Sequence, residues 1–493
     1  MPKPHDVDHV DIVIIGAGFA GIGLSIKLRE AGFTDFLVLE RAAAIGGVWR
    51  DNTYPGCACD VPSHLYSYSF APNPNWSRMY GKQHEILTYL RRLAADHDVI
   101  RHMRFNSELL EARWDDKASH WRLNTASGEL TARILVTATG LFTEASIPTL
   151  PGLDSFAGRA FHSLHWDHQH ELTGERVAVI GTGASAVQFI PEIQPIVKHL
   201  TVFQRSAPWI VSRLDRPTLA PERALLRKVP AVQRGLRAAY YGMIESFGLP
   251  GFVDRRFRHP FEAFGRLQLL RQVRDPELRR KLTPDYMIGC KRAIFSDSYL
   301  PALTQPNVTV ETSGIAEIRP RSITTRDGTE HPVDTIIFGT GFTMPPGAVA
   351  RIFGPAGISL GERYEQRPQS YLGVTTAGFP NVFSILGPFG AVGNQSAIYM
   401  IEQQISYIID ALKTIDSFRA QRIEVRPEVQ HRFMAEVEER SENTVWLKGG
   451  CKSYYTTPDG RNAGLYPNWS FEYRSRVKNF NSSDYVIKAG CNG

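Results

Sequence analysis

Two glycine-rich turns carry residue types that can bind phosphate groups. The first is Gly16-Ala-Gly-Phe-Ala-Gly21 and the second is Gly181-Thr-Gly-Ala-Ser-Ala186. In each, the first glycine permits a tight bend, the second lets backbone N–H groups approach a pyrophosphate, and the third small residue lets the next helix pack on the strand. Phosphates bound there would lie at a helix N-terminus, which favours negative charge. The turns therefore predict the binding of two dinucleotides.

The residue that ends the strand after each turn indicates which dinucleotide binds. Glu40 lies 24 residues after Gly16, whereas Gln204 lies 23 residues after Gly181 and is followed by Arg205. A carboxylate accepts hydrogen bonds from ribose hydroxyls but repels a 2′-phosphate, which arginine binds through charge-assisted hydrogen bonds. The second turn is therefore predicted to select NADPH over NADH. The alternative for Arg205 is a solvated surface cation.

The elements around the turns supply the context that dinucleotide binding requires. The continuously apolar segments 11–15 and 176–180 predict buried parallel strands, and each is followed by a turn, a helix and a second strand. Segment 134–140 predicts a further strand that ends in an Ala-Thr-Gly turn, and segment 335–341 predicts a similar one. Residues 214–282 change to an arginine-rich, amphipathic helical pattern. We therefore predict an α/β protein with two dinucleotide-binding (Rossmann-like) domains and an inserted helical subdomain.

A linker motif lies between the two turns. Phe156, Gly158, His162, Trp166 and Asp167 form the pattern F-x-G-x-x-x-H-x-x-x-W-D. In this position the motif resembles the fingerprint of the type I Baeyer–Villiger monooxygenases, which are class B flavoprotein monooxygenases. The resemblance implies FAD at the first turn, NADPH at the second, and O2 as co-substrate. It also implies insertion of one oxygen atom next to a ketone carbonyl, through a flavin peroxide, to give an ester or lactone.

The same resemblance implies how the chain is divided. We expect an FAD-binding domain from residues 1–150 and 336–493, and an NADP-binding domain from residues 151–213 and 286–335. Residues 214–285 are expected to form the helical insert of the NADP domain. For His162 we expect a packed side chain that couples the domains, because base chemistry requires reach to a reacting proton.

The resemblance also implies a reaction centre. Segment 54–60 resembles the family's flavin-side loop, with an aspartate at Asp60, and Cys290-Lys291-Arg292 resembles a pair in which lysine supports the 2′-phosphate and arginine reaches the flavin. We therefore predict Asp60 and Arg292 as the catalytic residues. A fixed guanidinium would stabilise the peroxide and the tetrahedral adduct without giving up its proton. The alternative is a surface ion pair worth at most ~1 kcal/mol.

The complete predicted cofactor-binding set contains no metal ligand. It consists of Gly16, Gly18, Ala20, Gly21, Glu40, Gly47, Val48, Trp49, Arg50, Asp60, Tyr66, Thr182, Gly183, Ala184, Ser185, Ala186, Gln188, Arg205, Ser206, Lys291, Arg292 and Tyr454. Two positions depart from the family's pattern. Cys57-Ala58-Cys59 lacks an arginine that is frequent in the flavin-side loop, and Tyr454 replaces the tryptophan of a Ser-Trp-Tyr segment. Both departures affect the expected contact with NADP.

Three other protein classes share parts of this pattern. A flavin disulfide reductase needs a pair of reactive thiols, but Cys57 and Cys59 are too close in sequence for an ordinary bridge within one strand. A flavin-containing monooxygenase, which oxidises amine or sulfide heteroatoms, is the principal alternative, although its linker usually lacks the terminal Trp-Asp. A non-catalytic flavin-binding protein is the third class, and intact glycines at both turns argue against it.

Composition bounds the remaining possibilities. The 493 residues are 43% hydrophobic and 22% charged, with a formal net charge of +6. Because no nucleic-acid-binding motif accompanies the basic residues, we expect no nucleic-acid partner. We also expect no secretory leader and no stable membrane insertion. The spacing of the five cysteines predicts no disulfide framework, so a cytoplasmic location is expected. As the resemblance implies, the partner is expected to be a small ketone. The helical insert and the aromatic residues in segment 446–473 favour an apolar or aromatic one.

Overall fold

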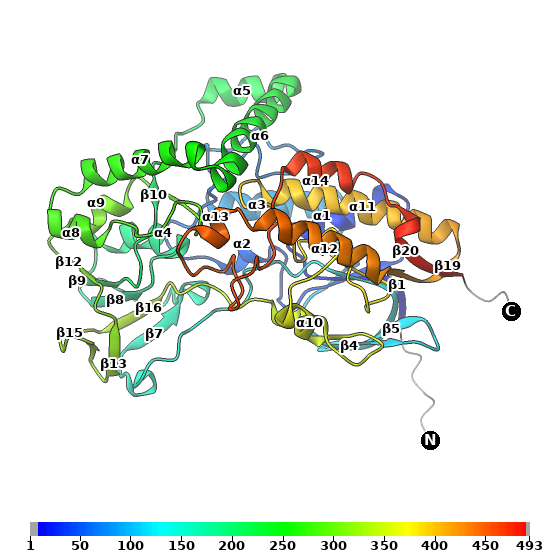
Figure 1. Cartoon of the computed structure of the whole chain (residues 1–493), viewed down its shortest axis with the longest axis horizontal. Coiled ribbons are helices and arrows are strands. Elements are labelled where there is room, and N and C mark those ends of the chain that lie inside the picture. Colours follow the sequence, from blue (N-terminus) through cyan, green and yellow to red (C-terminus); the bar gives the residue numbers. More distant parts are fainter. Residues whose placement is uncertain (1–7, 490–493) are drawn as a thin grey trace.

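The computed structural model describes residues 8–489, except for the side chains of Phe247 and Arg255. One half of the molecule is built on a mixed sheet and the other on a parallel sheet, and helices cover both (Figure 1). This arrangement confirms the predicted α/β class.

The first sheet has eight strands in the order β17-β4-β5-β6-β1-β2-β3, with β18 paired to β6. Its strands are β1 (Asp8–Ile15), β2 (Phe36–Leu39), β3 (Met103–Arg104), β4 (Leu109–Asp115), β5 (His120–Thr125), β6 (Gly128–Thr137), β17 (Ile352–Phe353) and β18 (Val382–Ser384). The helices of this half are α1 (Phe19–Glu30), α2 (Val48–Asp51), α3 (Gln83–Asp96), α10 (Leu360–Gln366), α11 (Ala397–Ser417), α12 (Pro427–Ser441), α13 (Val445–Lys448) and α14 (Ser470–Arg476). A short antiparallel pair, β19 (Ala420–Val425) and β20 (Tyr485–Ala489), completes it.

The second sheet has five parallel strands in the order β12-β9-β8-β16-β7. They are β7 (Arg159–His162), β8 (Arg176–Ile180), β9 (His199–Phe203), β12 (Val308–Glu311) and β16 (Thr335–Phe338), with α4 (Ala184–Ile193) and α9 (Tyr299–Leu303) beside them. The smaller strands are β10 (Ile210–Val211) with β11 (Ile294–Phe295), and β13 (Ile315–Arg319), β14 (Ser322–Thr325) and β15 (Glu330–Pro332). Because β16 pairs with both β7 and β8, it belongs to this second sheet.

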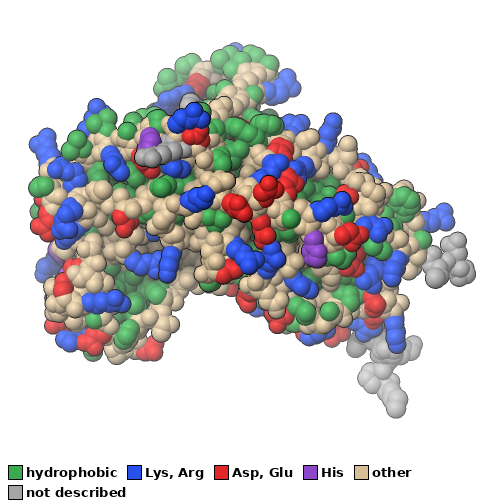
Figure 2. Space-filling view, in the orientation of Figure 1, with side chains coloured by type: hydrophobic (Ala, Val, Ile, Leu, Met, Phe, Trp, Pro, Cys, Tyr) green, Lys and Arg blue, Asp and Glu red, His purple; other side chains and the backbone are tan. Residues whose placement is uncertain are grey.

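Four helices form the insert: α5 (Ala220–Lys228), α6 (Pro230–Val253), α7 (Arg255–Gln272) and α8 (Pro276–Lys281). They lie within the predicted range 214–285. The α5–α6 hairpin protrudes from the upper edge of the molecule, and hydrophobic side chains gather on its surface (Figures 1 and 2). Within residues 8–489, no helix has the length and apolar character to cross a bilayer.

The glycine turns of the two halves make the same kind of close backbone contact. Gly16 has φ +108°, and a Cβ atom there would lie 2.7 Å from the carbonyl oxygen of Ala138. Gly181 has φ +105°, and a Cβ atom there would lie 2.5 Å from the carbonyl oxygen of Gly339. Each turn therefore needs glycine for its backbone conformation and for its close contact with the neighbouring strand. This contact fixes the position of the helix that follows.

Candidate active site

The first glycine turn leaves a helix N-terminus bare. Gly18 is the N-cap of α1 and makes no side-chain capping hydrogen bond. A Cβ atom on Gly47 would lie 3.1 Å from the Cα atom of Gly18, so the two glycines bring their backbones together. Gly21 lies under the turn, where a Cβ atom would be 1.9 Å from the carbonyl oxygen of Gly16. Ala20 and Val48 belong to the first turns of α1 and α2. Uncapped N–H groups beside a glycine surface fit a pyrophosphate.

Glu40 connects this turn to the next loop. Its carboxylate is buried and accepts hydrogen bonds from the backbone N–H groups of Ala17 and Ala42, each at 2.9 Å. Arg50 pairs with the same carboxylate at 3.0 Å. Both oxygens of a carboxylate can accept further bonds, so a ribose hydroxyl still fits. Sequence reasoning placed Arg50 in the cofactor-binding set without a defined role, and the structure identifies it as the countercharge of Glu40.

Trp49 and Tyr66 form an aromatic contact beside the first glycine turn. The indole Nε1 of Trp49 donates to the hydroxyl of Tyr66 at 3.1 Å, and the rings meet edge to face. Phe19 packs against the same tyrosine with ring centroids 5.4 Å apart. These contacts hold the start of α1 and the loop after α2 in a fixed relation.

The second glycine turn has the same bare helix start. Gly183 is the N-cap of α4 without a side-chain hydrogen bond, and Ala184, Ser185 and Ala186 form the first turn. The Thr182 hydroxyl donates to the carbonyl oxygen of Ser206 at 3.3 Å. The Gln204 amide donates to the carbonyl oxygen of Lys281 at 2.8 Å, which fixes the end of β9 against the insert.

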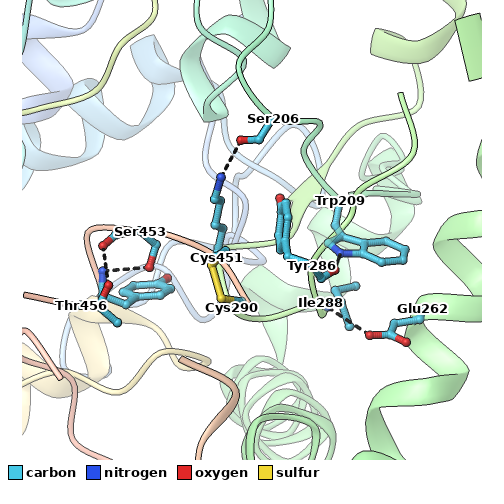
Figure 3. The surroundings of a disulfide bond; sticks show 11 residues. Ser206, Trp209, Glu262, Tyr286, Ile288, Cys290, Cys451, Ser453 and Thr456 are labelled. Atoms are coloured by element: carbon cyan, nitrogen blue, oxygen red, sulfur yellow. Dashed lines mark hydrogen bonds between the residues drawn. A yellow bond between two sulfur atoms is a disulfide. The ribbon is translucent and has the colours of Figure 1, made fainter. Parts of the chain in front are cut away.

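Arg205 and Lys291 form a cation pair beside this turn. Arg205 is exposed, and no carboxylate of the described chain lies within ion-pair distance of either cation. Lys291 donates to the Ser206 hydroxyl at 2.6 Å (Figure 3). Burial and, to a smaller extent, the charge of Arg205 lower the pKa of Lys291. Two like charges held together without a paired acid match the charge of a phosphate.

The predicted pairing of Asp60 with Arg292 is confirmed. Arg292 Nε donates to Asp60 Oδ2 at 2.8 Å across 232 residues of sequence. Burial opposes ionisation of Asp60, but Arg292 outweighs it and keeps the pKa of this carboxyl below its usual value. The charge of Asp60 in turn holds the pKa of Arg292 well above its usual value. Among the described residues, the Nη groups of Arg292 donate no hydrogen bond, and 39% of its side chain is exposed. The guanidinium is therefore anchored at one end and available at the other.

Tyrosines flank this guanidinium. Tyr454 and Tyr455 both contribute to the raised pKa of Arg292, and their hydroxyls lie 3.2 Å apart. Tyr454 is 51% exposed and meets the ring of Phe142 edge to face at 6.3 Å. The predicted cofactor-binding residue Tyr454 therefore lies beside the predicted catalytic pair.

Two interactions that sequence reasoning missed hold the loop that carries Asp60. Arg213 donates to the carbonyl oxygen of Cys59 at 2.7 Å and lies over the ring of Tyr80 at 5.0 Å. The amide of Gln188, a predicted cofactor-binding residue, contacts this loop: it donates to the carbonyl oxygen of Ala58 at 2.9 Å and accepts from the Tyr54 hydroxyl at 3.0 Å. Neither interaction has a sequence signal, because both depend on how the two halves meet.

The cysteines differ from expectation. Cys290 and Cys451, which are 161 positions apart in sequence, form a disulfide with Cα atoms 6.1 Å apart (Figure 3). The prediction of no disulfide is therefore wrong for this pair. The bond ties the segment that carries Lys291 and Arg292 to the segment that leads to Tyr454. Cys57 and Cys59 are free and buried, and burial raises the pKa of the Cys57 thiol to about 12. Cys491 lies outside the described residues.

The linker histidine is packed, as predicted. His162 is 2% exposed at the end of β7, and its Nδ1 accepts from the backbone N–H of Leu164 at 3.1 Å. Burial lowers the pKa of His162 to about 4, so the ring is neutral at pH 7. Trp166 packs on Phe189 of α4 at 5.2 Å, and Asp167 pairs with Arg159 at 2.6 Å. Trp166 and Asp167 therefore pack within the second half, whereas the His162 ring also meets Phe342, beyond β16, edge to face at 5.9 Å.

Known proteins resemble this chain over nearly its whole length. A family model described as pyridine nucleotide-disulphide oxidoreductase matches residues 13–221. A Baeyer-Villiger monooxygenase of Streptomyces coelicolor is 43% identical over 97% of this chain and 93% of its own length. A Baeyer-Villiger monooxygenase of Pseudomonas aeruginosa is also 43% identical, over 99% and 93%.

Solved structures of known monooxygenases have the same fold as this chain. An oxidised steroid monooxygenase bound to NADP superimposes with a TM-score of 0.87 at 30% identity, over 98% of this chain and all of that one. Cyclohexanone monooxygenase from Rhodococcus sp. Phi1, bound to NADP+, gives a TM-score of 0.88 at 28% identity over the same shares. These similarities span nearly the whole chain, including both glycine turns.

Proposed function

The chain belongs to the Baeyer–Villiger monooxygenases, and from this premise we propose how its own residues divide the work. The enzyme is an FAD- and NADPH-dependent oxidoreductase that oxidises a small ketone with O2. When bound, FAD would supply the redox chemistry: it would pass two electrons from NADPH to O2, so that one oxygen atom is inserted beside the carbonyl and the other leaves as water. This membership excludes the disulfide reductase and the non-catalytic flavoprotein as alternatives. The principal alternative, a heteroatom oxygenase, is not supported by these relatives.

We propose that the first glycine turn holds FAD. The bare N-terminus of α1 and the close approach of Gly18 and Gly47 support pyrophosphate binding there. Glu40, fixed by Arg50, is the acceptor for a ribose hydroxyl. Trp49 and Tyr66 then pack beside the cofactor. The Asp60 loop completes the site.

We propose that the second glycine turn holds NADPH. The pair of cations beside this turn supports the assignment. Arg205 is exposed without an acid partner, and Lys291 is held next to it by its hydrogen bond to Ser206. Such a pair attracts the 2′-phosphate of NADPH but has no charge to attract in NADH, which carries a hydroxyl at the same position. The Gln188 amide then serves to hold the flavin-side loop rather than to contact the cofactor directly.

The single observation that carries the assignment of catalytic residues is the state of Arg292. Its Nε is fixed by Asp60, while its Nη groups have no protein partner in the described chain. Such a guanidinium can donate to the oxygen that becomes negative when the carbonyl is attacked, and its donors need little reorganisation. Asp60 positions the side chain and remains ionised because its pKa is lowered. Arg292 therefore acts as the electrostatic catalyst and Asp60 as its positioning partner.

We propose an apolar or aromatic ketone as substrate. Phe142 packs against both Phe342 and Tyr454, and Tyr454 in turn packs against Tyr455, beside Arg292. Phe142 is 40% exposed, so apolar surface is available to a ligand beside the guanidinium. Such surface favours a bulky carbon skeleton over a polar one.

Two further expectations remain proposals. The FAD domain comprises residues 1–150 and the part after β16, and the NADP domain comprises residues 151–213 and 286–338 with the helices between them as its insert. We also propose that the enzyme works in the cytoplasm, now on the ground of its NADPH requirement alone. The disulfide between Cys290 and Cys451 removes the argument from cysteine usage.

Product analysis tests the proposed function. The holoenzyme is incubated with NADPH, oxygen-18 gas and a panel of cyclic, aryl-alkyl and steroid ketones, together with an amine and a sulfide. We expect one oxygen-18 atom in an ester or lactone, with apolar ketones converted fastest. Oxidation of the sulfide or amine with no ester from any ketone would contradict the ketone assignment. A preference for small polar ketones would contradict the proposed substrate class alone.

A further inference from the structure

The helical insert exposes an unusual amount of apolar surface. Of the 23 large hydrophobic residues that are exposed in the described chain, 12 lie between residues 214 and 270. Four follow α7 on its outer side and four surround the α5–α6 hairpin: Phe257, Phe264, Leu267, Leu270, Leu219, Leu225, Val229 and Val232. The inner side of α7 is already used, because Gly265, Gln268 and Leu269 are buried. Exposed apolar side chains gathered on one subdomain in this way indicate a site of interaction.

The same segment carries the positive charge of the protein. Residues 214–274 contain 12 lysines and arginines and 5 aspartates and glutamates, a difference of +7, whereas the whole chain has +6. All five acids are already engaged: four lie in ion pairs, and Glu245 is buried and hydrogen-bonded to Gln395 and Ser470. Seven cations of this segment are in no ion pair in the described chain: Arg223, Arg227, Lys228, Arg234, Arg266, Arg271 and Arg274. Their countercharge must come from outside the chain.

We propose that this surface of the insert, which we call the basic apolar surface, binds the face of an anionic lipid bilayer. Phenyl and aliphatic side chains enter the boundary between headgroups and acyl chains, and the unpaired arginines and lysines remain at the phosphates. Both sets of apolar residues lie on elements along the upper edge of the molecule (Figures 1 and 2). The contact is peripheral, because no described helix can span a membrane.

Charge decides between a bilayer and a second copy of the chain. A two-fold dimer through this surface would place the same basic patch against itself, and the unpaired cations of both copies would repel each other. An anionic bilayer neutralises the cations and buries the apolar residues in one step. The exposed aliphatic side chains also distinguish this surface from one that binds only free phosphate.

The insert also connects this surface to the site. Phe252, at the end of α6, packs on Trp446 at 5.2 Å. The same phenyl ring lies against Gly289, immediately before the Cys-Lys-Arg segment, where a Cβ atom would be 3.0 Å from it. A bilayer at the basic apolar surface would therefore lie against the helices that border the reaction centre. This inference rests on the structure of the insert and does not depend on which ketone is the substrate.

Vesicle flotation tests the proposal. The full-length holoenzyme is mixed with vesicles of equal parts phosphatidylcholine and phosphatidylglycerol, or of phosphatidylcholine alone. We expect binding to the anionic vesicles that is much stronger than to the neutral ones and that falls as salt is raised, since the Debye length shrinks from about 10 Å at 0.1 M to about 3 Å at 1 M. Replacing Arg227, Lys228 and Arg234 together with glutamine should weaken binding about fivefold for each charge removed.

An apolar variant and a matched control separate lipid binding from charge alone. Phe264→Ser should weaken binding at least about tenfold, the effect of losing one buried phenyl group. Phe418→Ser is the control, because Phe418 is 53% exposed at the end of α11, outside the insert. Turnover of a water-soluble ketone should be unchanged in all variants, which confirms folding. Absent or charge-independent vesicle binding, or equal losses in both Phe variants, would overturn the proposal. A dimer in sedimentation that Phe264→Ser abolishes, without vesicle binding, would assign the surface to a second copy.

Discussion

Replacing Arg205 with alanine should remove most of the preference for NADPH over NADH. Arg205 is exposed at the end of β9 and forms no ion pair in the described chain, so its loss leaves no buried acid unpaired. A charge-assisted hydrogen bond contributes about 1.5–3 kcal/mol, which corresponds to a loss of about 10- to 150-fold in NADPH binding. NADH lacks the 2′-phosphate and should bind almost as before.

The neighbouring lysine supplies a second, independent readout. Burial and the charge of Arg205 lower the pKa of Lys291, so this ammonium loses its proton at a lower pH than an ordinary lysine. Because only the charged form attracts phosphate, kcat/KM for NADPH should fall on the alkaline side as pH rises through that lowered pKa. Without Arg205 the like charge is gone, and the alkaline fall should move to higher pH. Lys291→Arg should abolish it, because guanidinium remains protonated.

Anaerobic rapid mixing measures this prediction directly. The rate of flavin reduction is recorded against NADPH and NADH concentration for the wild type, Arg205→Ala and Lys198→Ala. Lys198 is an exposed cation just before the opposite end of β9, so it controls for net charge. Equal losses for both nicotinamide cofactors in Arg205→Ala, or the same NADPH loss in Lys198→Ala, would refute the assignment of the 2′-phosphate site.

Three further predictions concern charge, burial and covalent structure. Asp60→Asn should lower ester formation about 10- to 100-fold while flavin reduction continues, because Arg292 keeps its charge but loses its fixed position; unchanged ester formation would show that Asp60 does not position Arg292. His162→Gln should reduce the loss of folding stability in acid. The pKa of His162 is about 4 in the folded protein and 6.5 in its ordinary state, so the unfolded chain binds the proton more readily between these pH values. The free energy of unfolding of the wild type should therefore fall by up to ~1.4 kcal/mol per pH unit as pH is lowered from 6.5 to 4. Denaturant unfolding at several pH values checks this, and an identical slope in the variant would contradict it. Cys451→Ser should destabilise the fold by about 2–4 kcal/mol; a reducing agent should lower the melting temperature of the wild type but not of the variant, and an insensitive wild type would show that the bond is absent.

Much of the fold was predictable because the periodic elements carry local signals. Strand 11–15 is apolar because it is buried, and positions 16 and 181 are glycine because their φ angles are positive. Both features can therefore be recognised in a single sequence. β16 shows the limit of such reasoning. Its sequence resembles the strand before the first Ala-Thr-Gly turn, but only pairing with β7 and β8 decides to which sheet it belongs.

Some features of the site could likewise be predicted from the sequence, and others could not. Asp60 and Arg292 could be predicted as a pair because each lies in a motif, although 232 residues separate them. Arg213, the bridging role of Gln188 and the bond between Cys290 and Cys451 could not, since they arise where loops from different halves meet. Irregular loops have no periodicity. No neighbouring residue in the sequence distinguishes one arginine among many, or shows which two of the five cysteines pair.

The coupling of NADPH consumption to ester formation in Arg292→Ala is the most direct test of the central claim. Arg292 has Nη groups without a protein partner in the described chain, beside a fixed carboxylate, and we propose that it stabilises negative charge on the reacting oxygens. The variant should retain FAD and be reduced by NADPH, while ester formation falls at least about 100-fold and hydrogen peroxide accounts for the NADPH consumed. Arg292→Lys should recover little of the loss, because a compact ammonium lacks the planar fork. If Arg292→Ala instead forms ester at the wild-type rate for each NADPH consumed, Arg292 is not the electrostatic catalyst and the assigned reaction centre is wrong.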